Sequence, residues 1–513
     1  MKQVLVFLLT LFSTGVAVGQ GPILQISNGR IEGTTNKTGD IRIFKGIPFA
    51  APPVGNLRWK APQPVANWSD VKKCVAFGPS PMQAKPAPFL YWSSEFLIPA
   101  EPISEDCLYL NVWTGAKSAT EKRPVLVYIY GGGFRSGGAA CPIYDGEAMA
   151  KKGVVLVNIN YRVGVFGFLA HPELTQESGY HASGNYALLD MIAALQWVQK
   201  NIAAFGGDPG NVTIAGQSAG AFAVNFLTAS PLAKGLFHRA IAESGGSFLT
   251  SPLRPRLTLQ DAEQQGIEFS KKLGAHSLGE LRTRSAEEIQ AANGGLSAPI
   301  VDGYLLPEGI YEIYAKGRQN DVPLLMGWNG DDKVMGAPVK AAVFKEQAIR
   351  RFGERADAYL AVYPARTEEE AALSQGYSNR DEVFGVQVYT WAKMQHQTGQ
   401  SPVFLYNFTR NVPAHNPQTR FGAFHTGEVP YAYNNLHTVD RPWEAVDRKI
   451  AEVMSSYWVN FAKTGNPNGK NLPSWLAYRS DTELVQGIDK TIANRPLPNR
   501  EQLAFWEQYY GKP

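Results

Sequence analysis

Apolar and polar positions follow two different patterns after about residue 106, one typical of buried strands and one typical of helices. Three apolar-rich runs, residues 108–113, 124–130 and 154–160, end in glycine-rich or polar loops. Such runs predict strands that are buried on both faces. Residues 185–205 instead carry apolar side chains at helical spacing, which predicts a long helix packed against those strands.

The same alternation continues toward the C-terminus. Further strands are predicted at residues 212–215, around 240–241, at 323–327 and at 402–408. Strands that alternate with helices predict an α/β fold with a large, mostly parallel central sheet covered by helices. Residues 258–294 are rich in Glu, Gln, Lys and Ala with helical periodicity, which predicts a helical insertion around 255–300 over the active site.

The first 19 residues have the features of a secretory signal peptide. Lys2 precedes an apolar stretch at residues 4–12, and Ala17-Val18-Gly19 forms a small-x-small cleavage site. Cleavage after Gly19 would leave residues 20–513 as a single domain, secreted or periplasmic. No later run approaches the roughly 18 apolar residues of a membrane helix, so we expect no stable membrane insertion.

Composition and charge narrow the class of protein. The chain has 44% apolar and 18% charged residues, which is ordinary for a globular enzyme with a large core. A net charge of +4, without a basic cluster interleaved with aromatic residues, argues against a nucleic-acid partner.

Export makes the three cysteines informative, because disulfides persist outside the cytosol. Cys74, Cys107 and Cys141 allow three pairings, each of which leaves one thiol free. Pairing Cys74 with Cys107 closes the shortest loop, but the residues alone leave the choice open.

Ser218 is the candidate nucleophile. It lies within Gly216-Gln217-Ser218-Ala219-Gly220, after the strand predicted at 212–215 and before an apolar helix-like run. Glycines permit a strained turn that lifts the serine Oγ clear of the sheet, and the following helix N-terminus faces negative charge at that oxygen. The strand, turn and helix together predict a nucleophile elbow.

An activated serine needs a base, and the base needs an acid to orient it. His425 is the candidate base because a tight glycine-containing loop surrounds it beyond a predicted strand. The acid is expected after another strand, where Asp331 and Asp332 are adjacent, and the residues alone leave both as candidates. The remaining seven of the eight histidines are interpreted as structural or solvated, among them His276, His396, His415 and His437.

Donors for a developing oxyanion are also present. Gly131, Gly132 and Gly133 end the strand at 124–130 and leave backbone N–H groups free, while Ala219 adds an N–H from the elbow. No phosphate-binding glycine motif, His-Glu-x-x-His sequence or cluster of metal ligands is present. We therefore expect neither a cofactor nor a metal.

Several long motifs in order resemble the type-B carboxylesterase/cholinesterase family of α/β-hydrolases. They lie at residues 44–53 with 57–59, at 105–112, at 205–220 and at 458–467. The resemblance covers nearly all of the mature sequence. It implies an α/β-hydrolase fold and a serine carboxylesterase, here of the secreted bacterial type.

The resemblance also implies roles for particular residues. Ser218 would be the nucleophile, His425 the general base and then acid, and Asp332 the orienting acid. The Gly132, Gly133 and Ala219 N–H groups would form the oxyanion hole. A Cys74–Cys107 disulfide, with Cys141 free, completes the set that is implied.

Three positions depart from the family pattern. Tyr130 stands where the family usually has a histidine before the glycine triplet, so support of that loop is expected to differ. Asp332 replaces a glutamate, so the two loops must close by about 1.5 Å, one C–C step. Lys333 replaces a glycine that commonly follows the acid.

The substrate is expected to be a small ester, with water as the second substrate. Residues 86–102 crowd aromatic and apolar side chains into one loop, which favours a neutral, short-to-medium acyl or aromatic ester over a choline ester. The same cluster is equally consistent with core beneath a long loop. Feruloyl-type or other specialised esters are the alternative within enzymes, and a non-catalytic adhesion or binding relative is the alternative outside them.

Overall fold

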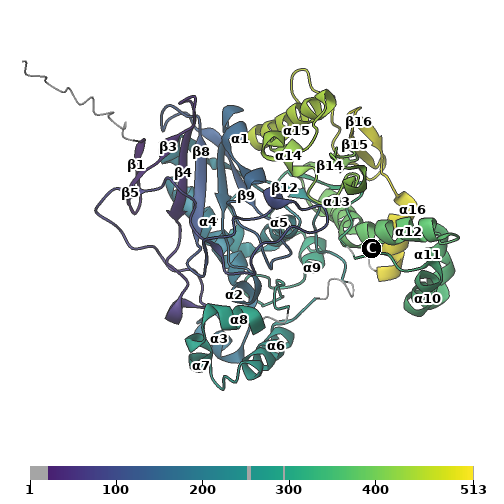
Figure 1. The fold of residues 1–513 in the computed structure, drawn as a ribbon, viewed down its shortest axis with the longest axis horizontal. Helices are drawn as coiled ribbons and strands as arrows, with labels where there is room; N and C mark the ends of the chain where they lie inside the picture. The colour runs from purple at the N-terminus through teal and green to yellow at the C-terminus, as the bar shows by residue number, and fades with distance from the viewer. Residues whose placement is uncertain (1–20, 251–255, 293–294, 335, 512–513) are drawn as a thin grey trace, which may run out of the picture.

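An eleven-stranded sheet crosses the part of the chain that the computed structural model describes, residues 21–250, 256–292, 295–334 and 336–511 (Figure 1). Its spatial order is β16-β15-β14-β13-β12-β11-β9-β10-β8-β4-β3. The strands are β3 (Thr34–Thr35), β4 (Arg42–Pro48), β8 (Tyr109–Thr114), β9 (Arg123–Ile129), β10 (Val155–Ile159), β11 (Gly207–Gln217), β12 (Arg239–Glu243), β13 (Leu324–Asn329), β14 (Val403–Phe408), β15 (Leu484–Ile488) and β16 (Ala493–Pro496).

The centre of the sheet is parallel and its edges are antiparallel. Strands from β10 through β9, β11, β12, β13 and β14 to β15 run in one direction, whereas β8, β4, β3 and β16 pair antiparallel. Every residue of β10, β13 and β14 is buried, as the continuous apolar runs require for strands covered on both faces. The predicted mostly parallel sheet is confirmed.

Two smaller sheets accompany it among the described residues. One joins β1 (Ile23–Ile26), β2 (Gly29–Glu32) and β5 (Lys72–Lys73), and the other pairs β6 (Ser80–Pro81) with β7 (Ile103–Ser104).

Helices surround the large sheet, some packed on its two faces and others away from it. They are α1 (Glu147–Lys151), α2 (Gly164–Phe168), α3 (Pro172–Glu177), α4 (Tyr186–Asn201), α5 (Ala219–Ala229), α6 (Leu259–Lys272), α7 (Leu278–Thr283), α8 (Ala286–Ala292), α9 (Ile310–Ala315), α10 (Ala341–Phe352), α11 (Ala356–Val362), α12 (Glu368–Arg380), α13 (Val386–Thr398), α14 (Val429–Ala432), α15 (Ala445–Thr464) and α16 (Arg500–Tyr510). β10 lies on one side of β9, whereas β11 and β12 follow on the other side. Right-handed crossovers therefore place α1 on one face of the sheet and α4 and α5 on the other. An ion pair between Lys152 and Glu452, 2.6 Å, joins the end of α1 to α15.

Two groups of helices stand away from the sheet. The predicted insertion at 258–294 forms α6, α7 and α8, which gather with α3 at the lower end of the molecule in Figure 1. The lobe of α10, α11, α12 and α16, at the right of Figure 1, was not predicted. Helices α10, α11 and α12 bury only part of their residues. Phe352 of α10 and Tyr359 of α11 pack against Trp506 of α16, which lies more than a hundred residues further along the chain.

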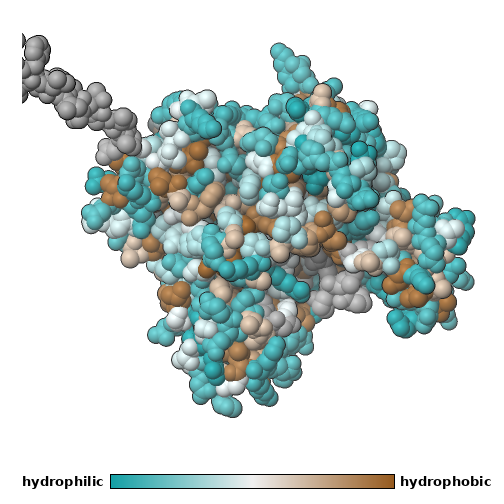
Figure 2. Space-filling model, in the orientation of Figure 1, coloured by the Kyte–Doolittle hydropathy of each residue, from teal (hydrophilic) through white to brown (hydrophobic). Residues whose placement is uncertain are grey.

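The predicted signal peptide, residues 1–19, lies outside the described residues. Within the described ranges, no helix combines the length and apolar character needed to cross a bilayer. The face drawn in Figure 2 is mostly hydrophilic, with apolar patches scattered between polar ones.

Candidate active site

Ser218 occupies a strained turn between β11 and α5. Its φ of 56° and ψ of −123° lie where side chains are rarely found, and the serine is partly exposed. The Ser218 N–H donates to the Glu243 carbonyl at 2.8 Å, and the Ser218 carbonyl accepts from the Phe222 N–H at 2.9 Å. The end of β12 and the first turn of α5 thus hold the strained residue from both sides.

His425 and Asp332 meet from two different loops. The histidine follows β14 and the aspartate follows β13, and both side chains are buried. Imidazole Nδ1 lies 2.5 Å from Asp332 Oδ1, while the other carboxylate oxygen accepts from the Asn329 N–H at 3.0 Å. A carboxylate at Nδ1 places the ring proton there and leaves Nε2 as an acceptor, which is the tautomer a general base requires.

The imidazole also lies against the nucleophile elbow. Gln217, the residue before the serine, has its Nε2 atom 3.4 Å from both ring nitrogens of His425. Within the described residues, no hydrogen bond links the Ser218 hydroxyl to the ring. Such bonds are often long in unliganded enzymes and shorten when substrate binds.

Asp331 has a different partner from Asp332. Its Oδ2 atom accepts from the Ala423 N–H at 2.8 Å, and its own N–H donates to the Ala423 carbonyl at 3.0 Å. These bonds draw the loop that carries His425 against the loop that carries Asp332. They account for how the shorter aspartate still reaches the imidazole.

Glycines at the end of β9 lie beside the serine. A Cβ on Gly131 would be 3.0 Å from the Ser218 Cβ, so this backbone abuts the elbow. Gly132 and Gly133 follow with φ of +112° and +62°, both exposed, and Ala219 begins α5. The Gln83 side chain holds the far end of the loop, since it donates to the Gly137 carbonyl and accepts from its N–H, each at 2.8 Å.

Two further buried carboxyl groups, Glu428 and Glu243, lie close to the His425–Asp332 pair. Asn329 donates its amide Nδ2 to Glu428, and Trp458 donates its indole N–H to Glu243 at 2.5 Å. Burial, followed by the charge of Asp332, raises the pKa of Glu428 well above its ordinary range. Burial raises the pKa of Glu243 to about 8. Burial thus favours the protonated, neutral form of both groups.

Two aromatic rings flank His425, one from the loop 86–102 that the sequence offered for the pocket and one that it did not predict. Phe384 stacks on the imidazole with centroids 4.7 Å apart, and Trp92 approaches it edge-on at 6.1 Å. Trp92 also donates its indole N–H to Thr426 at 3.1 Å. Phe384 lies in a π-helical turn, Asp381–Gly385, and no local motif marks it as part of a site.

The aromatic loop at 86–102 is divided between core and surface. Tyr91 and Phe96 are buried, and Tyr91 stacks on Phe424 with centroids 4.8 Å apart. Phe89 and Leu90 are 55% and 60% exposed. Part of the loop is therefore core, as one of the two interpretations held, and part remains available to a ligand.

The predicted Cys74–Cys107 disulfide is not formed, since both thiols are free. Lys45 donates its N–H to the Cys74 carbonyl, whereas Phe49 donates its N–H to the carbonyl of Leu108, next to Cys107. These two bonds lie four residues apart along the chain, so Cys74 and Cys107 sit beside different levels of this segment. A disulfide requires Cα atoms within about 7 Å, which this separation opposes.

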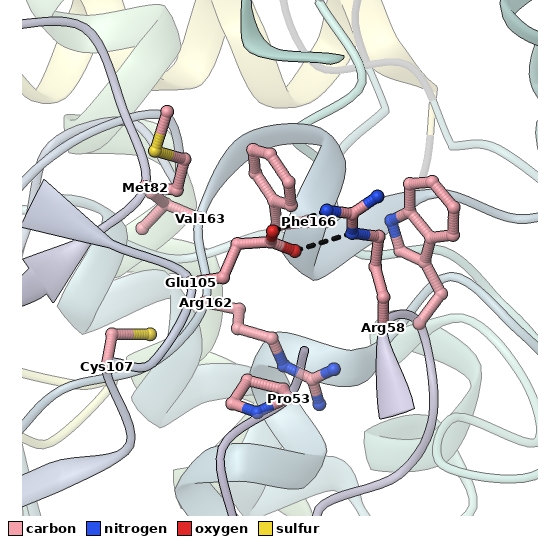
Figure 3. A pocket seen from close by; sticks show the side chains of 9 residues that line it. Pro53, Arg58, Met82, Glu105, Cys107, Arg162, Val163 and Phe166 are labelled. Atoms are coloured by element: carbon pink, nitrogen blue, oxygen red, sulfur yellow. Dashed lines mark hydrogen bonds and ion pairs between the residues drawn. The ribbon is translucent and has the colours of Figure 1, made fainter. Parts of the chain in front are cut away.

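Cys107 instead lines a small cavity with Met82, Pro53 and Arg162 (Figure 3). Arg58 and Glu105, which also line this cavity, form an ion pair at 2.5 Å. Cys141 is a free, buried thiol, as predicted. Burial raises the pKa of both the Cys74 and the Cys141 thiol to about 12, which keeps them protonated.

No group of three or more His, Cys, Asp or Glu side chains among the described residues is arranged to hold a metal ion. The site consists of a strained serine, a histidine bound to a buried carboxylate, and a glycine loop, at the ends of neighbouring strands of a parallel sheet. This arrangement is that of an α/β-hydrolase.

Comparison with known proteins gives the same class and a family within it. The chain belongs to the carboxylesterase family, whose model matches residues 20–506. It is 37% identical to fumonisin B1 esterase of Sphingopyxis macrogoltabida, over 89% of this chain and 85% of that one. It is 34% identical to para-nitrobenzyl esterase of Bacillus subtilis, over 94% and 98% of the two chains.

A solved structure of a PNB esterase superimposes with a TM-score of 0.81 at 32% identity, covering 94% of this chain and 99% of that one. The family and these relatives identify the chain as a carboxylic ester hydrolase, so the non-catalytic alternative is set aside.

Proposed function

We propose that this chain is a serine carboxylesterase that works through an acyl-enzyme intermediate. The observation that carries the proposal is the 2.5 Å contact between His425 and the buried Asp332, with the same imidazole packed against the elbow of Ser218. A buried carboxylate on Nδ1 prepares Nε2 to accept the serine proton.

In the proposed reaction, Ser218 Oγ attacks the ester carbonyl as His425 takes its proton. The N–H groups of Gly132, Gly133 and Ala219 then stabilise the oxyanion, aided by the N-terminus of α5. His425 returns the proton to the leaving alcohol, and water repeats the sequence to release the acid.

Substituting the nucleophile and the base tests this mechanism. We expect Ser218→Ala and His425→Ala each to lower ester turnover by several orders of magnitude, because members of such a triad act as a unit. Neither should change the thermal midpoint greatly. Retention of more than about a tenth of wild-type turnover in either variant would contradict the assignment.

Matched controls exist for both variants. Ser244 has the same φ of 56° at the end of the neighbouring strand β12, and His415 is an exposed histidine near Asp440. Ser244→Ala and His415→Ala should keep wild-type turnover.

The substrate is proposed to be a neutral ester with a short-to-medium acyl or an aromatic group. Support comes from the half-buried Trp92, edge-on to the imidazole, and from the exposed Phe89, whose ring centroid lies 4.7 Å from that of Trp92. A feruloyl-type or otherwise specialised ester is the second candidate. The relative named fumonisin B1 esterase makes that toxin a reasonable test substrate.

A substrate panel separates these candidates. The values of kcat/KM are compared for p-nitrophenyl esters of increasing chain length, methyl hydroxycinnamates, fumonisin B1, acylcholines and long-chain triglycerides. We expect the short-to-medium or aromatic neutral esters to lead. Faster turnover of acylcholines or of long-chain triglycerides would contradict the apolar-site interpretation.

Export to the periplasm or outside the cell is also proposed, from the composition of residues 1–19. N-terminal sequencing of the protein recovered from outside the cytoplasm should begin at Gln20. An intact Met1 on the native protein would contradict this proposal.

A further inference from the structure

Two buried tyrosines lie where β9 runs into the glycine loop. Tyr130 follows β9 and Tyr161 follows the neighbouring strand β10, and pairing of Ile129 with Ile159 brings the two strand ends side by side. The tyrosines are 1% and 0% exposed, and their rings stack with centroids 4.2 Å apart at 11°.

Each tyrosine hydroxyl bonds to the main chain of the other residue. The Tyr130 hydroxyl donates to the Tyr161 carbonyl at 2.8 Å, and the Tyr161 hydroxyl donates to the Tyr130 carbonyl at 2.9 Å. The Tyr161 N–H also points at the Tyr130 hydroxyl, at 3.4 Å. Burial raises the pKa of both phenols, so both remain neutral donors across any ordinary assay range.

The Tyr130 carbonyl is the one that leads into the glycine loop. It belongs to the planar peptide that carries the Gly131 N–H, so fixing the oxygen fixes the direction in which the loop departs. A Cβ on Gly220 would lie 3.0 Å from this same oxygen, which places it against the first turn of α5. The hydroxyl of Tyr161 therefore acts close to the elbow and not at a distant part of the core.

The other end of the loop is held by the same segment. The Phe134 carbonyl accepts from the Gly164 N–H at 2.7 Å, three residues after Tyr161. Between these anchors, Gly132 and Gly133 have positive φ, and the Gly132 carbonyl accepts from the N–H groups of Arg135 at 3.0 Å and Ser136 at 3.1 Å. These bonds set the Gly132–Gly133 peptide relative to the loop itself, so its direction relative to Ser218 depends on the two ends of the loop being fixed.

We propose that Tyr161 is a positioning residue of the oxyanion hole, whose hydroxyl fixes the Tyr130 carbonyl and thereby aims the Gly132 and Gly133 N–H groups. The Tyr130 hydroxyl holds Tyr161 in place. This inference rests on the proposed function, because it presumes a backbone oxyanion hole.

The pair is chemically symmetric but differs in position, which gives a sharp test. Tyr161→Phe removes the donor to the carbonyl that enters the glycine loop. Tyr130→Phe removes the donor to the Tyr161 carbonyl, which does not enter that loop. A purely structural pair would lose similar stability and similar activity in both variants, whereas positioning predicts a larger loss of kcat in Tyr161→Phe.

The measurements are kcat and KM for a p-nitrophenyl ester, the inhibition constant of a trifluoromethyl ketone, and the thermal midpoint. The ketone forms a tetrahedral oxyanion on the serine and so reports on the same N–H groups. Rates are normalised to active sites counted with an organophosphate, so that unfolded molecules do not contribute.

We expect Tyr161→Phe to lower kcat about 10- to 100-fold, since a misplacement near 1 Å can cost about 100-fold. Its KM should change less than about threefold, and ketone binding should weaken in parallel with kcat/KM. Tyr130→Phe should lower kcat by a smaller factor, about two- to fivefold. Tyr457→Phe is the control. Tyr457 lies in α15, and its buried hydroxyl likewise donates to a carbonyl, that of Pro473, at 2.6 Å.

The inference is overturned if Tyr161→Phe loses no more kcat than Tyr457→Phe, or if kcat falls while ketone binding is unchanged. If Tyr161→Phe does not fold, Tyr130→Phe is compared with Tyr457→Phe by the same two criteria. Failure of the proposed function would look different: the wild type would resist the ketone, or Ser218→Ala would stay active.

Discussion

At the scale of single residues, Asp331 and Asp332 are neighbours in the chain with different partners. Asp332 binds the His425 ring at 2.5 Å, while Asp331 accepts a backbone N–H from Ala423 at 2.8 Å. The ring contact orients the imidazole whose Nε2 atom takes the serine proton in the proposed reaction, whereas the backbone contact sets only the path of a loop. The two carboxylates should therefore respond very differently to the same substitution.

We expect Asp332→Asn to lower kcat on the order of 10⁴-fold, because an amide at this position favours the wrong imidazole tautomer. Asp331→Asn should change kcat less than about tenfold, since the amide oxygen of asparagine can still accept from Ala423. Steady-state kinetics on one ester measures both variants. If the larger loss fell on Asp331→Asn, Asp331 would be the orienting acid.

At the scale of elements, the site depends on how closely α5 packs against β9. A Cβ on Gly220 would lie 2.0 Å from the Ile129 carbonyl oxygen, far inside contact distance of a backbone atom. Glycine at this position lets the helix N-terminus and the Ala219 N–H approach the end of β9, where the glycine loop begins. The second glycine of the elbow motif is therefore required by packing between elements.

Gly220→Ala should destabilise the protein by about 3 kcal/mol, at the upper end for overpacking, and should lower activity with it. Gly279→Ala is the control: it lies in helix α7, and its added Cβ would meet only the Ser277 Oγ at 3.8 Å. That substitution should be neutral or slightly stabilising. Thermal and urea unfolding measure both, and equal midpoints for the two variants would refute the packing argument.

At the scale of the whole molecule, the buried carboxyl groups make stability depend on pH. Burial raises the pKa of Glu243 from an ordinary 4.5 to about 8. Between these two values the folded protein holds a proton that the unfolded chain has released, so stability falls as pH rises from about 4.5 to 8. Glu428 acts in the same direction.

Glu243→Gln removes this titration while keeping an oxygen for the Trp458 indole. The thermal midpoint of the variant, relative to that of the wild type, should therefore rise between pH 5 and pH 8. The corresponding gain in unfolding free energy has an upper bound of about 5 kcal/mol. Unfolding scans at several pH values measure the difference. A difference that stays constant across this range would show that Glu243 is ionised in the folded protein.

Features that depend on residues adjacent in the chain could be predicted from the sequence alone. The buried strands, the parallel sheet, the helices at 258–294 and the strained turn at Ser218 each follow from a short stretch of residues, through apolar periodicity or the freedom of glycine. The residues also indicated His425 and left Asp331 and Asp332 open, and the family resemblance favoured Asp332, which the structure brings to His425.

Only the tertiary structure decided which distant residues meet. The family resemblance implied a Cys74–Cys107 disulfide, but the two cysteines lie beside different levels of the segment that contains β4, and both thiols are free. Phe384 reached the imidazole from a π-helical turn, and Tyr161 reached the Tyr130 carbonyl from the next strand. The physical reason is common to all of these. Periodicity and glycine act through neighbours in the chain, whereas strand register and helix packing bring together atoms that no local pattern connects.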